Sequence, residues 1–384
     1  MPFCHAGKAK MHSMFKILSA TILLGSMNML YGAVVLPPYF ADNMVLPADK
    51  EIKVSGKSSD GERISLQIAG KKYEITADEN GLWQIIILPL MPQKNLSLII
   101  SGSNSPAVLF KNIAVGEVFV CGGQSNMVVP VSYANDSGDY SCSARDDIRF
   151  YFNGKWQILS EKNYKGFPAV PFFFAVEYGR MTDRTIGVSV AAEGGTGIEA
   201  WLPVENIPET LTGKKMKSLA TDAEVIAAAK ADRANPMLPY GKHRLARWNL
   251  GRAYPSELYT KYIIPLKDMP VSGMIWYQGE SNADSLTMAS EYDLWLKQLI
   301  DVWRHVIADV PVLVVELPRY HSPTAESPES WDILRQAQQR GVQPVTKAIM
   351  VKAYDLGDPD NIHPKRKRAM GIRIAETLNK YQNK

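Results

Sequence analysis

The stretch Val118-Phe-Val-Cys-Gly-Gly-Gln-Ser-Asn-Met127 joins a strand-forming run to a glycine-rich bend. Its valine and phenylalanine residues favour a β-strand, and a bend after the strand can hold Ser125 at the mouth of a sheet. Glycine, serine and asparagine also favour ordinary turns, so this stretch alone favours a turn over a nucleophile. The segments that follow it in the chain decide between these two interpretations.

Strand-like runs alternate with helical patterns after Gly116, and the expected strands lie at residues 117–121, 186–192, 271–277, 312–317 and 348–354. The clearest helix is expected at 290–307, where apolar residues recur at three- and four-residue steps. Further helices are expected at 171–181, 222–232, 256–266, 331–340 and 365–378. This alternation predicts an α/β domain at 114–384 with a parallel sheet covered by helices on both faces. Ligands bind such sheets beyond the carboxyl ends of the strands.

A small antiparallel β-sandwich domain is expected before it, at residues 34–113. Apolar and polar residues alternate over 63–69, which is typical of a strand with one buried face. Turn dipeptides separate the strand-like runs, namely Asp60-Gly61, Ala69-Gly70 and Asn80-Gly81. Closely spaced strands without helices between them favour a sandwich.

Residues 1–33 have the pattern of a signal peptide. Lysines at 8, 10 and 16 accompany an apolar run whose core, 18–24, is too short to span a bilayer, and Gly32 and Ala33 could mark the cleavage site. The pattern predicts export to the periplasm or the extracellular space, with no stable membrane insertion after the signal is removed. In an oxidising compartment Cys121 and Cys142 could pair, although Cys121 also fits a small buried thiol.

Composition narrows the classes of partner. The chain has 46% hydrophobic and 21% charged residues and a net charge of +4, which indicates a globular protein. Its one dense basic cluster, Lys365-Arg-Lys-Arg368, is expected on the solvated face of a helix, so no nucleic-acid partner is predicted. The sequence lacks metal-ligand spacings and phosphate-binding glycine motifs, so we expect neither a metal nor a cofactor.

Polar residues follow the carboxyl ends of four expected strands. They are Ser125, the run Glu193-Gly-Gly-Thr-Gly-Ile-Glu-Ala-Trp201, the run Gln278-Gly-Glu-Ser-Asn282 and the run Asp355-Leu-Gly-Asp-Pro-Asp-Asn-Ile-His363. A serine hydroxyl needs a general base to become a nucleophile at neutral pH. His363 is the candidate base, because Asp360 precedes it by three residues and a carboxylate can orient an imidazole. Asp355 and Asp358 are competing carboxylates.

Acyl transfer also needs hydrogen-bond donors for the oxyanion that forms on the attacked carbonyl. The candidate donors are the backbone N–H groups of Ser125 and Gly195 and the side-chain amide of Gln278. Each of these residues alone is typical of a turn or a strand end. Together, at four strand ends of one sheet, they predict a hydrolase site with a serine nucleophile.

Four blocks carry a resemblance to a known family: Gly123–Met127, Gly194–Trp201, Ile275–Ala283 and Asp360–Pro364. Two further segments, Phe40–Leu46 and Leu334–Gln338, match other landmarks of that family. The chain resembles the sialate O-acetylesterase family within the SGNH (GDSL-like) hydrolases. The resemblance implies a flavodoxin-like three-layer catalytic domain and a triad of Ser125, Asp360 and His363. It also implies an oxyanion hole at Ser125, Gly195 and the third block, where Gln278 and Asn282 are the two possible amide donors and Gln278 is preferred.

The resemblance further implies a carboxylic ester hydrolase that removes acetyl groups from sugars, most directly from O-acetylated sialic acid. Acetylated xylan or another plant glycan is the alternative substrate, and a secreted glycan-binding protein on a hydrolase scaffold is the non-enzymatic alternative. A lipase or thioesterase of the same fold is less favoured, because the aromatic residues near the blocks suit sugar stacking. Substrate contacts are expected from Gln124, Asn126, Glu280, Asn282 and Trp201. A sialic acid carboxylate could pair with Arg247, Arg252 or Arg335.

Overall fold

The computed structural model describes residues 34–383 except 136–144, 153, 236–237 and 239–241. The predicted signal peptide at 1–33 and the predicted pairing of Cys142 lie outside the described residues. In the described part of the chain, no helix combines the length and apolar character needed to cross a bilayer. Cys121 is a free thiol, and its complete burial raises its pKa.

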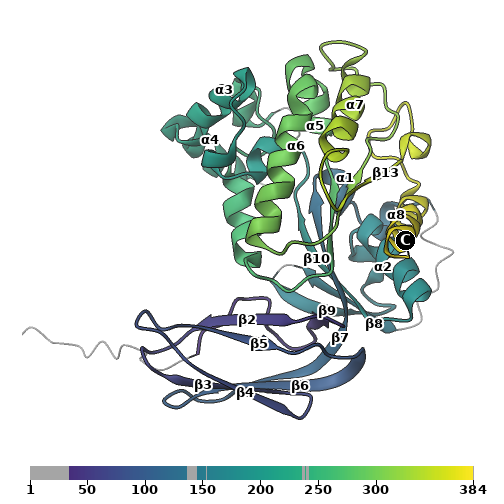
Figure 1. Cartoon of the computed structure of the whole chain (residues 1–384). Helices are drawn as coiled ribbons and strands as arrows, with labels where there is room; N and C mark the ends of the chain where they lie inside the picture. Colours follow the sequence, from purple (N-terminus) through teal and green to yellow (C-terminus); the bar gives the residue numbers. More distant parts are fainter. Residues whose placement is uncertain (1–33, 136–144, 153, 236–237, 239–241, 384) are drawn as a thin grey trace, which may run out of the picture. The chain divides into compact units, whose positions relative to one another are not determined.

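An antiparallel β-sandwich forms the first part of the described chain (Figure 1). Its strands are β2 (Ile52–Lys57), β3 (Arg63–Ile68), β4 (Lys71–Thr76), β5 (Leu82–Ile87), β6 (Gln93–Gly102) and the first part of β7 (Val108–Gly123). Strand β2 pairs with β5, while β4, β3, β6 and β7 form the other sheet. The alternation over 63–69 is confirmed, since Ile64, Leu66 and Ile68 are buried and Gln67 is exposed.

A mostly parallel sheet forms the centre of the second part, in the strand order β13-β12-β11-β7-β10-β8-β9. Its further strands are β8 (Arg145–Phe152), β9 (Lys155–Leu159), β10 (Ile186–Ala192), β11 (Gly273–Tyr277), β12 (Val312–Val315) and β13 (Ala348–Val351). All neighbours in this order pair in parallel except β8 and β9. The predicted parallel α/β sheet is therefore confirmed, whereas the β8–β9 hairpin at its edge was not predicted.

Helices cover both faces of this sheet. They are α1 (Ser125–Val128), α2 (Ala169–Thr182), α3 (Leu211–Ala220), α4 (Ala223–Arg233), α5 (Glu280–Ala283), α6 (Leu286–Val306), α7 (Ser330–Val342) and α8 (Lys367–Gln382). In β7, Phe119 makes edge-to-face ring contacts with α2, whereas a Cβ on Gly122 would lie 2.4 Å from the Trp303 ring of α6. Positions 119 and 122 point to opposite faces of a strand, so α2 and α6 cover opposite faces. Helix α8 packs beside α2 and α7 beside α6 (Figure 1).

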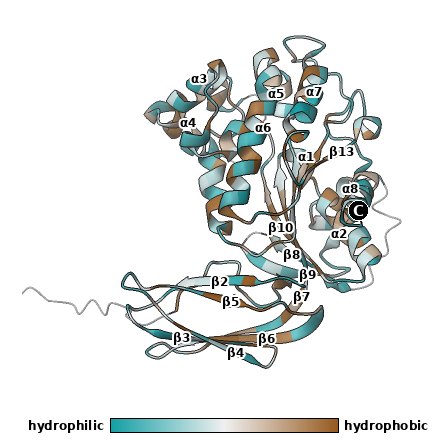
Figure 2. Cartoon of the chain, in the orientation of Figure 1, coloured by the Kyte–Doolittle hydropathy of each residue, from teal (hydrophilic) through white to brown (hydrophobic). Residues whose placement is uncertain are grey.

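The buried stripe of α6 matches the predicted helix, although α6 begins at Leu286 rather than at 290. Tyr292, Leu296, Leu299 and Trp303 are all buried. The segment expected as a helix at 256–266 is helical but not a regular α-helix: a π-helical turn at Tyr259–Ile263 leads into a 3₁₀ turn at Ile264–Leu266. Pro265 has no N–H to donate, so a regular α-helix cannot continue through it. Figure 2 shows hydrophobic colour along the inner strands of both sheets and on one side of α6.

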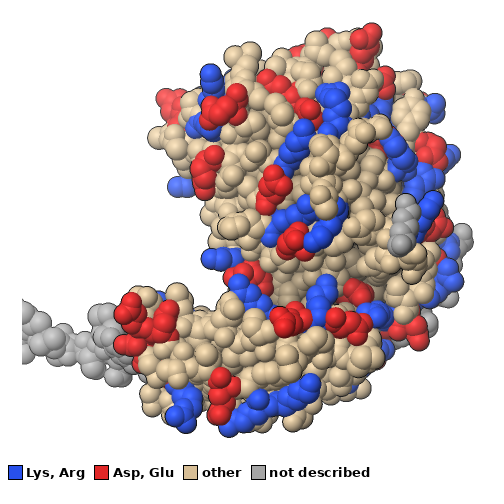
Figure 3. Space-filling view, in the orientation of Figure 1, with Lys and Arg blue, Asp and Glu red and all other residues tan. Residues whose placement is uncertain are grey.

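Strand β7 belongs to both sheets. Its first part pairs with β1 (Val45–Pro47) and β6, and its second part pairs with β10 and β11. The boundary expected between 113 and 114 falls inside this continuous strand, so the division into two domains stays a prediction. On the face shown in Figure 3, basic and acidic side chains lie intermingled.

Candidate active site

Ser125 lies at the carboxyl end of β7, in the middle of the parallel sheet. The strand ends at Gly123, whose φ of 141° is open to glycine and whose Cβ, if present, would lie 2.0 Å from the Tyr277 carbonyl oxygen. The chain can therefore turn closely past the end of β11. Ser125 is then the first residue of α1, whose first N–H groups have no acceptor within the helix.

His363 meets Ser125 from the other end of the chain. Its Nε2 lies 2.8 Å from Ser125 Oγ, a hydrogen-bond distance. The turn that carries His363 is held by Tyr133, whose hydroxyl donates to the His363 carbonyl oxygen (3.0 Å) and accepts from Asn361 Nδ2 (3.2 Å). Asn126 Nδ2 also donates to the Ile362 carbonyl oxygen at 2.9 Å. The structure thus brings together the predicted nucleophile and the predicted base.

The predicted acid is not part of this contact. Asp360 is exposed, and its backbone N–H donates to Asp358 Oδ1 at 3.1 Å, but in the described chain its carboxylate has no hydrogen bond to His363. Asp355 instead pairs with Arg373, with Nη2 and Oδ2 2.9 Å apart. The role of Asp360 stays a prediction, and the structure contains a serine–histidine pair.

The pKa of His363 lies below its ordinary value. Burial of the ring is the larger cause, and the positive charge of Lys367 is the second. Both disfavour the imidazolium, so the ring is held in the neutral form that can accept the serine proton.

The predicted oxyanion donors divide into two groups. Gly194 packs against Ser125, because a Cβ on Gly194 would lie 3.4 Å from the Ser125 Cβ, and Gly195 follows with a positive φ of 73°. Their turn therefore borders the nucleophile. Gln278, in contrast, is fully buried and its amide N–H groups already have protein acceptors: Gln124 Oε1 (3.0 Å), Thr196 O (3.1 Å) and Asn282 Oδ1 (2.7 Å).

The side-chain amide of Asn282, the alternative oxyanion donor, also has hydrogen-bond partners within the protein. Its Nδ2 donates to Glu199 Oε2 at 2.9 Å, and its Oδ1 accepts from the backbone N–H of Ile198 at 3.0 Å. The contacts of Gln278 and Asn282 tie the end of β11 to the turns after β7 and β10. The oxyanion roles of Gln278 and of the backbone N–H groups of Ser125 and Gly195 stay predictions.

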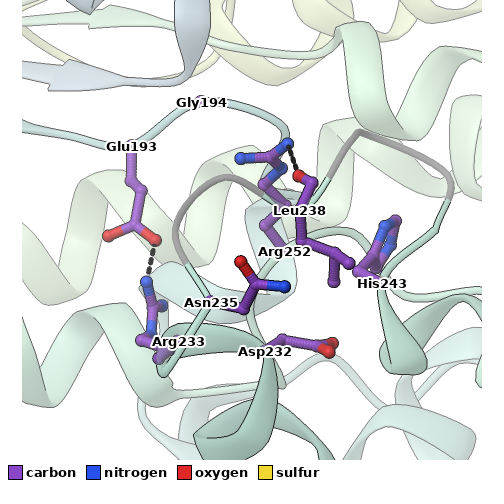
Figure 4. Close-up of a pocket in the computed structure, with 8 residues that line it drawn as sticks. All are labelled: Glu193, Gly194, Asp232, Arg233, Asn235, Leu238, His243 and Arg252. Carbon is purple, nitrogen blue, oxygen red and sulfur yellow. Dashed lines mark hydrogen bonds and ion pairs between the residues drawn. The ribbon is translucent and has the colours of Figure 1, made fainter.

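A pocket of about 260 Å³ borders the same turn (Figure 4). It is lined by Glu193, Gly194, Asp232, Arg233, Asn235, Leu238, His243 and Arg252. Gly194 joins this pocket to the serine. Of the three arginines proposed for a carboxylate, Arg252 lines the pocket, with its Nη2 donating to the Leu238 carbonyl oxygen at 3.0 Å.

The other two arginines lie elsewhere. Arg247 stacks on Trp248, 3.8 Å from the ring centroid, and Arg335 lies over the Tyr354 ring at 5.0 Å. Across the described residues, no group of three or more histidine, cysteine, aspartate or glutamate side chains could hold a metal ion.

Residues 238–380 match the family of carbohydrate esterases described as sialic acid-specific acetylesterase. The matched segment contains His363 and the Gln278 block, whereas Ser125 precedes it. The sialate O-acetylesterases of Mus musculus and Homo sapiens are each 24% identical over 359 and 353 residues, covering 79% of this chain and 64% and 61% of their own lengths. The chain thus spans less than two thirds of the length of these relatives.

A solved structure supports the fold over most of the chain. The carbohydrate acetylesterase of Xanthomonas citri aligns with a TM-score of 0.73 and 26% identity, over 90% of this chain and 75% of its own. The alignment covers more of the chain than the segment matched by the family, so the likeness is not confined to the C-terminal blocks.

The residues expected to contact substrate are buried in the structure. Gln124, Asn126, Glu280, Asn282 and Trp201 are each at most 4% exposed. Trp201 packs on Tyr262, Trp276 and Trp303 rather than offering a free face to a sugar. Of the four polar side chains, Asn126 donates to Glu280, whereas Gln124 and Asn282 both accept from Gln278 Nε2, so these contacts tie the strand ends to one another.

The burial of Lys367 was not predicted from the sequence. The basic cluster 365–368 was expected on a solvated face, and Lys365 and Arg366 are exposed, but Lys367 is only 2% exposed. Its position is three and seven residues before Met370 and Ile374, which belong to the buried stripe of α8. The helical periodicity therefore places position 367 on the buried face of α8, although a charged residue there is expected to be exposed.

Proposed function

We propose that this chain is a carbohydrate O-acetylesterase that hydrolyses acetyl esters on sugars through an acyl-serine. The observation that carries the proposal is the 2.8 Å contact between His363 Nε2 and Ser125 Oγ at the carboxyl edge of the parallel sheet. The family match over residues 238–380 and the names of the relatives support the acetyl ester and the carbohydrate.

The residues support the following sequence of steps. His363 Nε2 accepts the Ser125 proton as Oγ attacks the acetyl carbonyl, and the N–H groups of Ser125 and Gly195 stabilise the oxyanion. The C–O bond to the sugar then breaks, and the sugar oxygen takes the proton from His363. A water molecule, deprotonated by His363, attacks the acetyl-serine; the bond between Oγ and the acetyl carbon breaks, acetate leaves, and Ser125 Oγ takes the proton back from His363. A low pKa of His363 keeps more of the ring in the neutral form that can accept a proton, and it makes the imidazolium a stronger acid when the ring returns that proton.

We propose O-acetylated sialic acid as the first substrate to test. Arg252 lines the pocket next to Gly194, so a sugar carboxylate bound there would lie beside the serine. Acetylated xylan carries no such carboxylate on its acetylated residues and is the alternative substrate. We further propose export of the chain, on the pattern of residues 1–33.

Acetate release from O-acetylated sialic acid and from acetylated xylan tests the proposal. We expect wild-type enzyme to release acetate, and Ser125→Ala to lose at least about 10³-fold in kcat because the nucleophile is gone. Ser218→Ala, an exposed serine on α3, is the matched control and should retain wild-type activity. Release from xylan alone would keep the mechanism and overturn the sialic acid substrate. Folded wild-type protein without release from either substrate would favour the glycan-binding alternative.

A further inference from the structure

Three buried polar side chains form a chain of hydrogen bonds beneath the serine and histidine. Lys367 Nζ donates to Asn126 Oδ1, and Asn126 Nδ2 donates to Glu280 Oε1 at 2.5 Å. The exposed fractions are 2% for Lys367, 1% for Asn126 and 3% for Glu280. The steps of the proposed reaction do not use any of these three groups.

The two ends of this chain fix the orientation of the amide between them. A lysine ammonium only donates and an ionised carboxylate only accepts, so the charged forms of Lys367 and Glu280 turn the oxygen of Asn126 to Lys367 and its nitrogen to Glu280. In that orientation the second N–H of Asn126 reaches the Ile362 carbonyl oxygen at 2.9 Å. Asn126 directly follows Ser125, and Ile362 directly precedes His363. One amide therefore ties the nucleophile to the base, and its orientation depends on Lys367.

We propose that Lys367 is a positioning residue for the Ser125–His363 pair and acts through Asn126. The inference rests on the proposed function, because the pair needs positioning only if it reacts. Burying a lysine costs free energy unless its hydrogen bonds are satisfied, so a lysine at 2% exposure beside the reacting pair is costly to keep for packing alone. Methionine or leucine would fill the same space on the buried stripe of α8.

The charges around the site have signs that agree with this role. Burial lowers the pKa of Lys367 to about 7, with Glu280 acting in the opposite direction, and burial raises the pKa of Glu280 to about 7. Other titratable groups around the site are Tyr133, beside the His363 ring, and Tyr277 and Tyr292, which both interact with Glu280. The positive charge of Lys367 lowers the pKa of His363, so removing that charge should raise it.

Two variants separate the hydrogen bond from the charge. Lys367→Gln removes the charge but keeps a donor for Asn126 Oδ1, whereas Lys367→Met removes both and keeps most of the volume. Lys380→Met, an exposed lysine on the same helix, makes the same change in net charge and is the matched control. The readouts are the rate of Ser125 phosphonylation by a fluorophosphonate and the His363 ring pKa from proton NMR, with His363→Gln to assign the signal. In phosphonylation the serine oxygen forms a bond to phosphorus, fluoride leaves, and His363 takes the proton.

We expect Lys367→Met to be phosphonylated about 10- to 100-fold more slowly than wild type, because small displacements of a reacting pair have effects of that size. Lys367→Gln should keep most of the rate, and both variants should raise the pKa of His363. Lys380→Met should match wild type in both readouts. In an Asn126→Ala background, Lys367→Met should add little further loss, since the two residues act in series.

Several outcomes would overturn the proposal. Wild-type phosphonylation of Lys367→Met would do so, as would equal slowing by both Lys367 variants, because the donated hydrogen bond would then have no effect. Should Lys367→Met fail to fold, an unchanged His363 pKa in folded Lys367→Gln would decide against it. A wild-type protein that is phosphonylated at Ser125 but releases no acetate would contradict the proposed function alone. Acetate release that requires Ser125 but is unaffected by Lys367→Met would contradict the positioning role alone.

Discussion

His363 determines how the proposed reaction should respond to acid. Burial and Lys367 lower its pKa below the ordinary value of 6.5, and the base must be neutral to accept the Ser125 proton. A lowered pKa keeps the ring neutral to lower pH, so kcat/KM should fall only below pH 6.5. The measurement is kcat/KM for nitrophenyl acetate across about pH 4.5 to 8, the range in which imidazoles titrate. An acid limb centred above 6.5 would contradict the assignment.

Glu280 needs a control in that experiment, because burial raises its pKa to about 7 and it could titrate in the same range. Glu280→Gln keeps an oxygen that can accept from Asn126 and removes the ionisation. The acid limb should persist in this variant if it belongs to His363. Its disappearance would assign the limb to Glu280.

At the scale of an element, α7 stabilises the strand ends through one side chain. Gln338 Nε2 donates to the carbonyl oxygens of Val315 (3.2 Å) and Gln278 (3.3 Å), and its Oε1 accepts from the Leu317 N–H (2.9 Å). Gln338→Leu should lower the free energy of unfolding by about 2 kcal/mol, because the buried N–H of Leu317 loses its acceptor. Urea unfolding measures this loss. Gln336→Leu, exposed on the same helix, should change stability by less than about 0.5 kcal/mol, and an equal loss in both variants would argue against the role of Gln338.

The same elements show which features could be predicted from sequence. Strand β10 was predicted with its observed bounds because its run of small and β-branched residues is buried between two neighbours. Strand β8 was missed because Arg149, at 0% exposure, interrupts any apolar pattern. Its guanidinium donates to the Asn43 carbonyl oxygen (3.2 Å) and to Asn112, contacts between distant segments that periodicity cannot reveal.

The site could be predicted in part for the same reason. The contact between Ser125 and His363 could be anticipated because strand ends and turn residues mark both positions locally, and the parallel sheet brings such ends to one edge. The burial of Gln278 and the task of Lys367 depend on partners 82 and 241 residues away, respectively. From sequence alone, such polar residues are interpreted as substrate contacts or as solvated charges. Their buried partners become apparent only from the packing.

For the whole described chain, the continuous strand β7 predicts that the sandwich and the parallel sheet unfold together. Other contacts join the same parts: Lys53 Nζ pairs with Asp268 Oδ1 at 2.9 Å, and the Tyr39 hydroxyl donates to the Lys267 carbonyl oxygen at 3.1 Å. The sandwich cannot open fully without releasing β7 from β6, and a released β7 weakens its pairing with β10 and β11. The two regions should therefore share one free energy of opening.

Hydrogen exchange in rising urea measures this free energy for each region. The amides of Leu66 in β3 and Leu313 in β12 should converge to within about 1 kcal/mol as global unfolding becomes the dominant route. Gly116→Ala provides the sharper test, because a Cβ there would lie 2.0 Å from the Thr185 carbonyl oxygen, at the point where β7 passes between the sheets. This substitution should lower the opening free energy of both amides by the same amount. If Leu66 alone exchanged faster, the sandwich would be an independent folding unit and β7 would not couple it to the sheet that carries Ser125.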